Sequence, residues 1–331
     1  MTRLGVVLSP DYVERKILLD FIGMLEDGGY EAVFVPEIWG RDAFTFLAQV
    51  AEITNKIKIG TSIVNIFSRS PATLAMTASS LAEISNGRFI LGLGLSGPIV
   101  IEQLHGIKFE KPLQRTKETV EIIRTLVRGE RLNHKGEIFN VERFKLSFRD
   151  FQYHIPIFLA SLGPKNLELA GEIADGWFPL WMTPQSFPKM LNNVELGLKK
   201  SQKSRDSFTI APFMITVASD DSSVRDLARG HIAYYIGGMG TFYYELMVRH
   251  GYKDVADKIQ EAWKKNDREK AASIIPDDLL DDLTLAGKTD EVRERIDMWR
   301  ALGVDLPLIF LPYKCPINIA MDTLQSLAPH Q

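Results

Sequence analysis

The chain has 331 residues, of which 45% are hydrophobic, and a formal net charge of -3 at neutral pH. This length fits two average domains or one α/β barrel, and the small charge gives no sign of a nucleic-acid scaffold or a membrane-surface protein. The apolar runs are far too short to span a bilayer. The single cysteine, Cys315, excludes an internal disulfide and a multi-cysteine metal site. Because a strand-like run begins by residue 4 with no secretory signal before it, we expect a cytoplasmic protein.

Apolar runs that predict strands alternate with amphipathic patterns that predict helices along the whole chain. In chain order, the predicted strands cover residues 4–8, 32–35, 57–60, 89–93, 156–160, 176–180, 208–217 and 306–311. The predicted helices cover residues 17–25, 42–53, 74–84, 113–126, 166–173, 186–198, 290–302 and 317–327. Between them, residues 129–154 are polar with scattered aromatic residues and predict an excursion or a short hairpin.

About eight short strands that alternate with helices are typical of an α/β protein, a (β/α)8 TIM barrel. A doubly wound sheet is the alternative, but no G-x-G-x-x-G motif follows the first strand. Residues 222–285 show helical periodicity without an evident strand and are too long for one βα unit, so we interpret them as a helical insertion late in the barrel. No repeat or linker interrupts the pattern, and we predict a single domain over residues 1–331.

In a barrel, functional residues lie in the loops at the C-terminal ends of the strands. After the third strand, residues 60–65 are mostly small and let another molecule approach the backbone, although an ordinary βα loop has the same spacing. After the second strand, Trp39 suits packing on a planar ring, and Glu37 suits proton exchange or the orientation of a donor. After the fifth strand, residues 161–164 open a helix whose free N–H groups suit a phosphate, although a plain helix N-cap followed by proline has the same sequence.

Other residues point to less specific chemistry. His231, Tyr234 and Tyr235 lie in the predicted insertion, and residues 237–240 (Gly-Gly-Met-Gly) after them suit either the hinge of a lid or a plain loop. No H-E-x-x-H, nucleophile elbow or Walker loop occurs, and no histidine and carboxylate have metal-ligand spacing. The sequence therefore gives no support to hydrolysis, to phosphoryl transfer or to a metal site.

Several short motifs occur in one order along nearly the whole chain. They are residues 37–44, 60–64, 70–72, 85–89, 91–94, 96–98, 105–106, 160–164, 170–176 and 287–289. As a set, they resemble the bacterial-luciferase-like flavin and deazaflavin oxidoreductases. The best match is the branch that uses coenzyme F420, which includes methylene-tetrahydromethanopterin reductase. The fold of that family, a (β/α)8 barrel with insertions, agrees with the pattern of strands and helices.

The resemblance implies an oxidoreductase, in which a hydride passes between C5 of the deazaflavin and an organic substrate. It implies a non-proline cis peptide bond at Ser62–Ile63, behind the central ring of the cofactor, with the cofactor phosphate at residues 161–164. The candidate catalytic residue is Glu37, as a proton donor. The candidate cofactor-binding residues are Trp39, Ser62, Ile63, Val64, Asn65, Leu95, Ser96, Gly97, Ala160, Ser161, Leu162, Gly163 and Pro164. Many relatives are homodimers, so the resemblance also implies a homodimer.

The sequence departs from relatives on the substrate side of this pattern. Val7 stands where the reductases have a glutamate in the first strand, and Ile38 stands where several relatives have a histidine after the acid. The resemblance therefore implies the cofactor but leaves the substrate open. One alternative is an FMN-dependent two-component monooxygenase with a separate flavin reductase as its partner. A second alternative is a non-catalytic cofactor-binding protein of the same fold.

Overall fold

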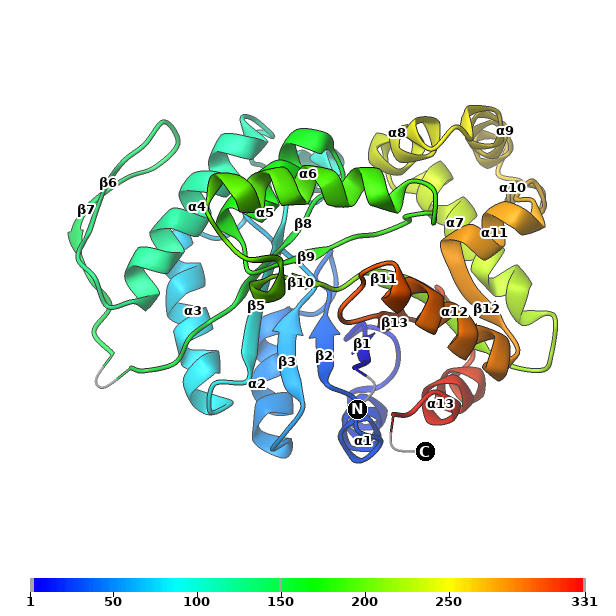
Figure 1. Cartoon of the computed structure of the whole chain (residues 1–331), viewed down its shortest axis with the longest axis horizontal. Coiled ribbons are helices and arrows are strands. Elements are labelled where there is room, and N and C mark those ends of the chain that lie inside the picture. The colour runs from blue at the N-terminus through cyan, green and yellow to red at the C-terminus, as the bar shows by residue number, and fades with distance from the viewer. Residues whose placement is uncertain (1–2, 149–150, 330–331) are drawn as a thin grey trace.

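The computed structural model describes residues 3–148 and 151–329 (Figure 1). The strands are β1 (Gly5–Val7), β2 (Ala32–Val35), β3 (Lys58–Thr61), β4 (Val64–Asn65), β5 (Phe89–Gly94), β6 (Leu132–Lys135), β7 (Asn140–Phe144), β8 (Ile157–Ala160), β9 (Gly176–Phe178), β10 (Thr209–Ile210), β11 (Phe213–Ala218), β12 (Thr284–Gly287) and β13 (Leu308–Phe310). The helices are α1 (Arg15–Asp27), α2 (Ala43–Ile53), α3 (Pro71–Ile84), α4 (Pro112–Val127), α5 (Pro164–Ile173), α6 (Phe187–Lys200), α7 (Val224–Gly238), α8 (Thr241–Arg249), α9 (Lys253–Lys264), α10 (Arg268–Ser273), α11 (Asp277–Leu283), α12 (Thr289–Ala301) and α13 (Ile317–Ser326). A π-helical turn (Val100–Leu104) and a 3₁₀ turn (Arg205–Ser207) are also present.

A parallel sheet that curls on itself forms the centre of the molecule. Its strand order is β10-β9-β8-β5-β3-β2-β1-β13-β11-β12, and β4 pairs with β5. Only residues 211–212 separate β10, which pairs with β9, from β11, which pairs with β13. Segment 209–218 therefore connects the two edges of the sheet: its first part pairs with β9, its second part pairs with β13, and β13 pairs with β1. From β1 to β10 each strand of the curled sheet lies beside the next one along the chain, and only β12, which pairs with β11 and not with β13, departs from this rule. This order matches a TIM barrel and excludes the doubly wound alternative, in which the order reverses.

Aromatic side chains fill the inside of the curled sheet. Phe34 and Phe178 pack edge to face with their ring centres 5.1 Å apart, and Phe178 stacks on Phe213 at the same separation. Phe213 in turn packs against Phe310, with ring centres 6.2 Å apart. Phe310, the last residue of β13, is only partly buried and forms the upper layer of this interior, next to the loops that follow the strands. We call this end of the barrel, at the carboxyl ends of the strands, the barrel mouth.

Two motifs of the sequence hold the opposite end of the barrel together. The guanidinium of Arg88, just before β5, donates to backbone oxygens of Thr54 and Ile57 at 2.8 Å. Asp175, just before β9, accepts from Arg124 and from the backbone N–H of Ile157, both at 2.8 Å. These contacts lie at the amino ends of the strands. The motifs at residues 85–89 and 170–176 therefore stabilise the fold. The other motifs are candidates for the functional site at the mouth.

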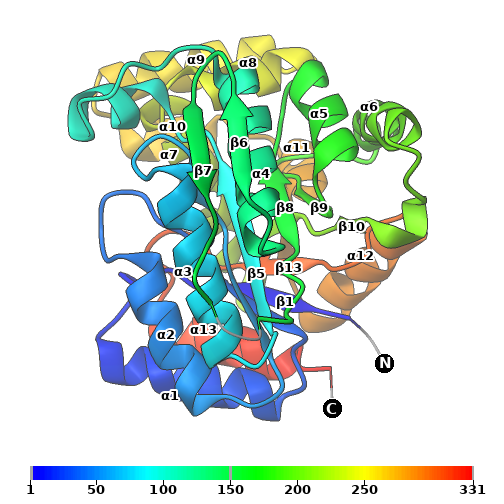
Figure 2. The ribbon, with the colours of Figure 1, turned by 90° about the vertical axis from the view of Figure 1, so that its left-hand side faces the viewer.

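The polar segment at residues 129–154 contains the antiparallel hairpin β6–β7, which projects beside α4 (Figures 1 and 2); residues 149–150 of this segment lie outside the described residues. The buried carboxylate of Glu118 in α4 anchors the hairpin. It accepts from the N–H groups of Glu137 at 2.8 Å and Phe139 at 2.9 Å, and from Gln114 at 2.7 Å. Burial alone would raise the pKa of Glu118, but these hydrogen bonds and one from His134 outweigh it and lower the pKa to about 2.

Five helices, α7 to α11, occupy the segment that the sequence predicts as a helical insertion, and they lie between β11 and β12. In Figure 1, α8 and α9 lie on the side to which the arrows of β2 and β3 point, which is the side of the mouth. No helix within residues 3–148 and 151–329 is long and apolar enough to cross a bilayer.

The structure corrects three predictions about single elements. The strand predicted at 208–217 is two strands, because Pro212 has no N–H to donate and interrupts the ladder. The segment 222–285, predicted without a strand, ends in the first residues of β12, whose Thr284 pairs with Ile215. Strand β4, at Val64–Asn65, was not predicted, since two residues carry no periodic signal.

Candidate active site at the barrel mouth

The loop after β3 has a fixed and unusual backbone. The peptide bond between Ser62 and Ile63 is cis, at the position that the resemblance implies. The N–H of Ser62 donates to the carbonyl of Val35 at 2.8 Å, and the carbonyl of Ile63 accepts from the N–H of Glu37 at 3.2 Å. Both contacts reach the end of β2. The loops after β2 and β3 therefore form one connected part of the mouth.

Close packing of β3 on β5 supports this loop. A side-chain carbon at Gly92 would lie 1.8 Å from the carbonyl oxygen of Thr61, so only glycine fits there. The Thr61 hydroxyl accepts from the Gly92 N–H at 2.9 Å and donates to its carbonyl at 2.7 Å. Two residues further along β5, a side-chain carbon at Gly94 would lie 2.7 Å from a side-chain carbon of Ile63. The motif at residues 91–94 thus serves to bring the Ser62–Ile63 bond against β5.

Beyond this bond, Val64 and Asn65 are buried and pair with Leu93 and Gly94 of β5. The side-chain oxygen of Asn65 accepts from the backbone N–H groups of Phe67 at 3.0 Å and Ser68 at 2.8 Å. Asn65 therefore shapes the chain that leads to α3, and its oxygen is already occupied.

The loop after β5 leaves open space beside the backbone. Leu95, Ser96 and Gly97 are partly exposed, and Ser96 has a left-handed backbone with φ of 60°. A side-chain carbon at Gly97 would meet no other atom within 4 Å. At the end of β5, a side-chain carbon at Gly94 would lie 3.4 Å from the Cβ atom of Ala160, the last residue of β8. The loops after β3, β5 and β8 are thus neighbours.

The loop after β8 runs directly into α5. Gly163 caps the helix without a side-chain hydrogen bond, and Pro164 occupies the first turn. A side-chain carbon at Gly163 would meet nothing within 4 Å, so the space in front of the helix is open. The carbonyl of Ser161 accepts from the indole N–H of Trp177 at 2.9 Å, which fixes the loop from β9. Leu162 packs against the apolar cluster of α7 to α11.

Three buried oxygens of this part of the mouth lack a hydrogen-bond partner among the described residues: Ser62 Oγ, Ser161 Oγ and Asn166 Oδ1. A buried polar atom without a partner costs about 1–3 kcal/mol, and native proteins contain few of them. Ser161 is only 1% exposed. The serine hydroxyls and the uncapped helix N–H groups can donate to a phosphate, whereas Asn166 Oδ1 can only accept, for instance from a hydroxyl group of the ligand. The donor set therefore fits a phosphate-bearing cofactor.

Glu37 is held in an ion pair. Its two oxygens accept from the two terminal nitrogens of Arg69 at 2.5 and 2.9 Å, and one also accepts from the N–H of Ala43 at 3.0 Å. The hydrogen bonds to Glu37 raise the pKa of Arg69. Burial opposes ionisation of Asp42, but hydrogen bonds from Thr45 and the charge of Arg69 lower its pKa. The loop after β2 is therefore tied to the start of α2 by charged groups.

Trp39, two residues further, is 58% exposed. Its loop is held by Asp11, which follows β1 and accepts from the backbone N–H of Arg41 at 3.1 Å. Val7, at the end of β1, is buried and pairs with Phe34 and Phe310, so no acid is present at that point.

An aromatic wall of Trp181, Tyr235 and Tyr243 bounds the mouth on the side of α7 and α8. The ring centres of these residues lie 4.8 to 5.6 Å apart. The sequence places Trp181 after the sixth predicted strand and points to Tyr235 in the predicted insertion, but it gave no signal for Tyr243 or for the contact among the three rings.

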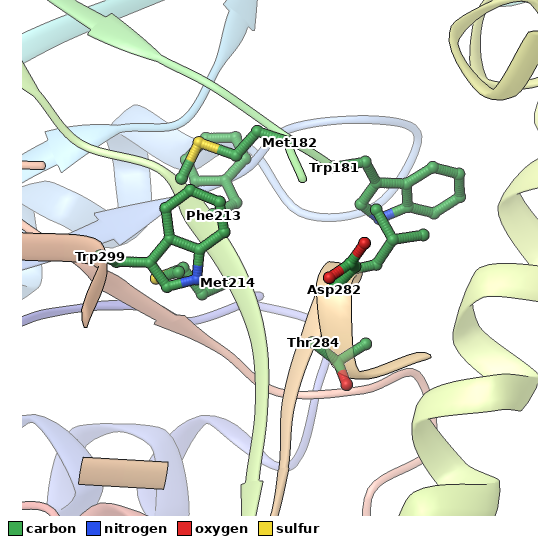
Figure 3. Close-up of a pocket in the computed structure, with 8 residues that line it drawn as sticks. Trp181, Met182, Phe213, Met214, Asp282, Thr284 and Trp299 are labelled. Atoms are coloured by element: carbon green, nitrogen blue, oxygen red, sulfur yellow. The ribbon is translucent and has the colours of Figure 1, made fainter. Parts of the chain in front are cut away.

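Figure 3 shows a small cavity beside Trp181, whose lining residues are Trp181, Met182, Phe213, Met214, Asp282, Leu283, Thr284 and Trp299. Its volume is ≈ 10 Å³, on the order of a single water molecule. Neither Glu37 nor Ser161 lines this cavity, and it is too small for an organic substrate. The site is therefore the mouth itself, where the loops after β2, β3, β5 and β8 meet. Within the described parts of the chain, no group of three histidine, cysteine or acidic residues is placed to hold a metal.

Comparison with known proteins identifies the family. A family model described as "Luciferase-like monooxygenase" matches residues 8–306. The chain belongs to the luciferase-like monooxygenase family. It is therefore an enzyme of the oxidoreductase class, and the family contains the F420-dependent branch that the motifs resemble.

Individual members of the luciferase-like family match over most of their length. A Mycobacterium tuberculosis protein that is named as a coenzyme F420-dependent oxidoreductase is 34% identical, over 88% of this chain and 89% of its own. The 5,10-methylenetetrahydromethanopterin reductase of Archaeoglobus fulgidus is 33% identical, over 91% of both chains. The solved structure of the coenzyme F420-dependent tetrahydromethanopterin reductase from Methanopyrus kandleri superimposes with a TM-score of 0.87 and 24% identity, over 99% of this chain and 97% of the other. At that identity, the last likeness shows the shared fold.

Proposed function

We propose that this protein is an F420-dependent oxidoreductase, in which a hydride passes between C5 of the deazaflavin and an organic substrate. The observation that carries the proposal is the open start of α5, where the hydroxyl of Ser161 is buried without a partner among the described residues. The relatives named for F420 support the choice of cofactor.

The residues of the mouth divide into two tasks in this proposal. The segment Ser161 to Pro164 holds the phosphate, since it offers the hydroxyl of Ser161 and open space in front of a helix. Ser62 to Val64, with Leu95 to Gly97 beside them, support the ring, because the cis bond and β5 fix their backbone. The deazaflavin, when bound, supplies the hydride chemistry. The protein supplies binding, orientation and exclusion of water.

The contacts of Glu37 favour a positioning role over proton transfer. A general acid has to release a proton from its carboxyl group, whereas both oxygens of Glu37 accept hydrogen bonds from Arg69 and Ala43. The ion pair with Arg69 holds the loop that presents Trp39. The role of Glu37 in proton transfer stays a prediction, which the substitution Glu37→Gln tests.

Parallel titrations with F420 and with FMN, followed by quenching of tryptophan fluorescence, test the proposal. We expect saturable quenching by F420 at micromolar concentration and none by FMN in the same range, because Trp39 and Trp177 border the two proposed parts of the site. Preference for FMN would turn the assignment to a two-component monooxygenase, and rapid oxygen consumption with reduced FMN would support it. Binding of neither cofactor would contradict both assignments.

The activities for which the relatives are named suggest which substrates to test. Turnover of methylenetetrahydromethanopterin with reduced F420 would give this protein the activity for which the Archaeoglobus fulgidus relative is named. Binding of F420 without turnover of any pterin, alcohol or carbonyl compound would favour a non-catalytic cofactor-binding protein.

A further inference from the structure

A buried histidine of α7 lies at the rim of the mouth. His231 is 3% exposed, stacks on Tyr235 with ring centres 4.7 Å apart, and meets the edge of Phe310 at 5.1 Å. Phe310 belongs to the upper layer of the barrel interior, together with Ile63 and Ala160, which lie in the proposed cofactor site. His231 therefore stands over the same opening as the proposed cofactor, on the side of β13.

The hydrogen bonds of His231 fix its tautomer. Nδ1 accepts from the backbone N–H of Tyr313 at 2.9 Å, so Nδ1 carries no proton and Nε2 carries one. Burial lowers the pKa of His231 to about 3, so the ring is neutral near pH 7. Nε2 is buried and has no partner among the described residues. A buried N–H without an acceptor is costly, which indicates that it meets one in another state of the protein.

The surroundings of this N–H are aromatic and uncharged. Burial raises the pKa of Tyr243 to about 12, and raises that of Tyr235 further, so both hydroxyls stay protonated. Beside the imidazole, Tyr313 stacks on Tyr234 with ring centres 5.1 Å apart and is 57% exposed. An exposed side chain changes rotamer quickly, so the Tyr313 ring can leave its stack with Tyr234 without loss of core contacts. A planar, uncharged molecule with one hydrogen-bond acceptor suits such a place.

We propose that Nε2–H of His231 binds the carbonyl oxygen of a planar, uncharged organic substrate, held beside the aromatic wall of Trp181, Tyr235 and Tyr243. This inference rests on the proposed function for the source of the hydride. When a hydride adds to the carbonyl carbon, a C–H bond forms, the C=O π bond breaks, and its electron pair moves to the oxygen. The N–H stabilises the negative charge there, and water supplies the proton that completes the alcohol. Reduced F420 is oxidised by two electrons in this step.

A matched pair of substitutions separates this role from a structural one. In His231→Asn, the amide replaces Nδ1 and keeps an acceptor for Tyr313, but nothing replaces Nε2. In His231→Gln, the amide reaches the place of Nε2 and keeps a donor there, but the acceptor for Tyr313 is lost. The proposal therefore predicts that the Gln variant is active and the Asn variant is not. A residue that only anchors the loop of Tyr313 would give the reverse order.

The probe is benzaldehyde, with reduced F420 under anaerobic conditions, followed by the return of the oxidised deazaflavin absorbance. We expect kcat/KM to fall 10- to 100-fold in His231→Asn and less than about fivefold in His231→Gln, with the F420 dissociation constant unchanged in both. His134→Asn, which alters a buried histidine on the β6–β7 hairpin, is the control and should match the wild type. The reverse order, or equal activity in all variants, would overturn the proposal.

A second measurement does not depend on turnover or on F420. In protein labelled with ¹⁵N-histidine, the Nε2–H resonance, assigned by its loss in His231→Asn, should shift when benzaldehyde is added to the wild type. Failure of F420 to bind, with this shift present, would overturn the proposed function but leave the carbonyl site standing. Absence of the shift, with F420 bound, would overturn the carbonyl site alone. If both variants lose F420 binding, the substitutions have rearranged the mouth and their activities are not informative. The shift of the wild-type Nε2–H resonance on addition of benzaldehyde then decides whether the carbonyl site exists.

Discussion

The substitution Glu37→Gln tests whether the carboxyl group of Glu37 moves a proton or positions a loop. Glutamine has nearly the same shape but no charge, and its NH₂ group would face the guanidinium of Arg69. The carboxylate now accepts two hydrogen bonds from Arg69 and one from Ala43. If the glutamine oxygen takes the place of Oε2, which accepts from Ala43 and from Arg69, the variant loses the Arg69 bond to Oε1, and the remaining bond to Arg69 loses its charged acceptor.

The size of the effect on stability follows from burial. Hydrogen bonds to charged groups contribute about 1.5–3 kcal/mol each. The side chains of Glu37 and Arg69 are 12% and 21% exposed, and Arg69 keeps Asp42 as a partner, so solvent and Asp42 offset part of the loss. We expect a net cost of about 2 kcal/mol. With an unfolding entropy of about 2.1 cal/mol/K per residue, the 331 residues give about 0.7 kcal/mol/K, and Tm falls by about 3 °C.

Three measurements on the same variant separate the two roles: Tm by calorimetry, the F420 dissociation constant by fluorescence, and kcat with a turned-over substrate. For a positioning role we expect the lower Tm, weaker F420 binding, and kcat within about tenfold of the wild type at saturating F420. Glu31→Gln is the matched control. Glu31 pairs with Arg3 at 2.7 Å and Lys58 at 3.0 Å at the other end of the barrel, so it should lower Tm without any effect on F420.

A fall in kcat of more than about 100-fold, with Tm and the F420 dissociation constant unchanged, would refute the positioning role. It would show that the carboxyl group transfers a proton despite its contacts with Arg69.

Three further predictions concern the phosphate site and the hairpin. Gly163→Ala should leave Tm unchanged, since the added carbon meets nothing within 4 Å, but should weaken F420 binding about tenfold. Gly171→Ala is the contrasting control: its added carbon would lie 2.0 Å from a carbonyl oxygen of α6, so Tm should fall instead. Ser161→Ala should weaken F420 binding about fivefold without loss of Tm, because Oγ has no partner within the described structure; unchanged affinity would remove Ser161 from the site. The pKa of Glu118, about 2 in the folded protein, lies below its unfolded value of about 4.3, so Glu118 stabilises the protein above pH 4.3 and this stability is lost as pH falls towards 2. Glu118→Gln should therefore flatten the pH dependence of Tm in that window, and an unchanged profile would contradict the anchoring of the hairpin.

Local signals were strong enough to predict most elements. The strand at residues 32–35 is confirmed, and the helices are confirmed with ends shifted by a few residues. Apolar periodicity and turn residues act over a few positions, so the sequence alone carries them. The break at Pro212 and the short strand β4 escaped prediction, because both depend on which partner strand lies alongside.

Site residues divide in the same way. The open helix start at Gly163 could be predicted, since proline and glycine at a helix start are local signals. The ion pair of Glu37 with Arg69 could not, because 32 positions separate the two residues and only the loops after β2 and β3 bring them together. The same holds for His231, whose partners Tyr313 and Phe310 come from the far end of the chain.

The sequence by itself thus determined the alternation of strands and helices, the family resemblance and the segments that form the mouth. The tertiary structure decided which side chains are already satisfied and which are not. Glu37, the most reactive residue in the sequence pattern, is occupied by a salt bridge, whereas Ser161 and His231 hold buried polar atoms without partners in the described part of the chain. The physical reason is that hydrogen bonds and burial depend on groups brought together by strand order, and a linear pattern carries no record of those neighbours.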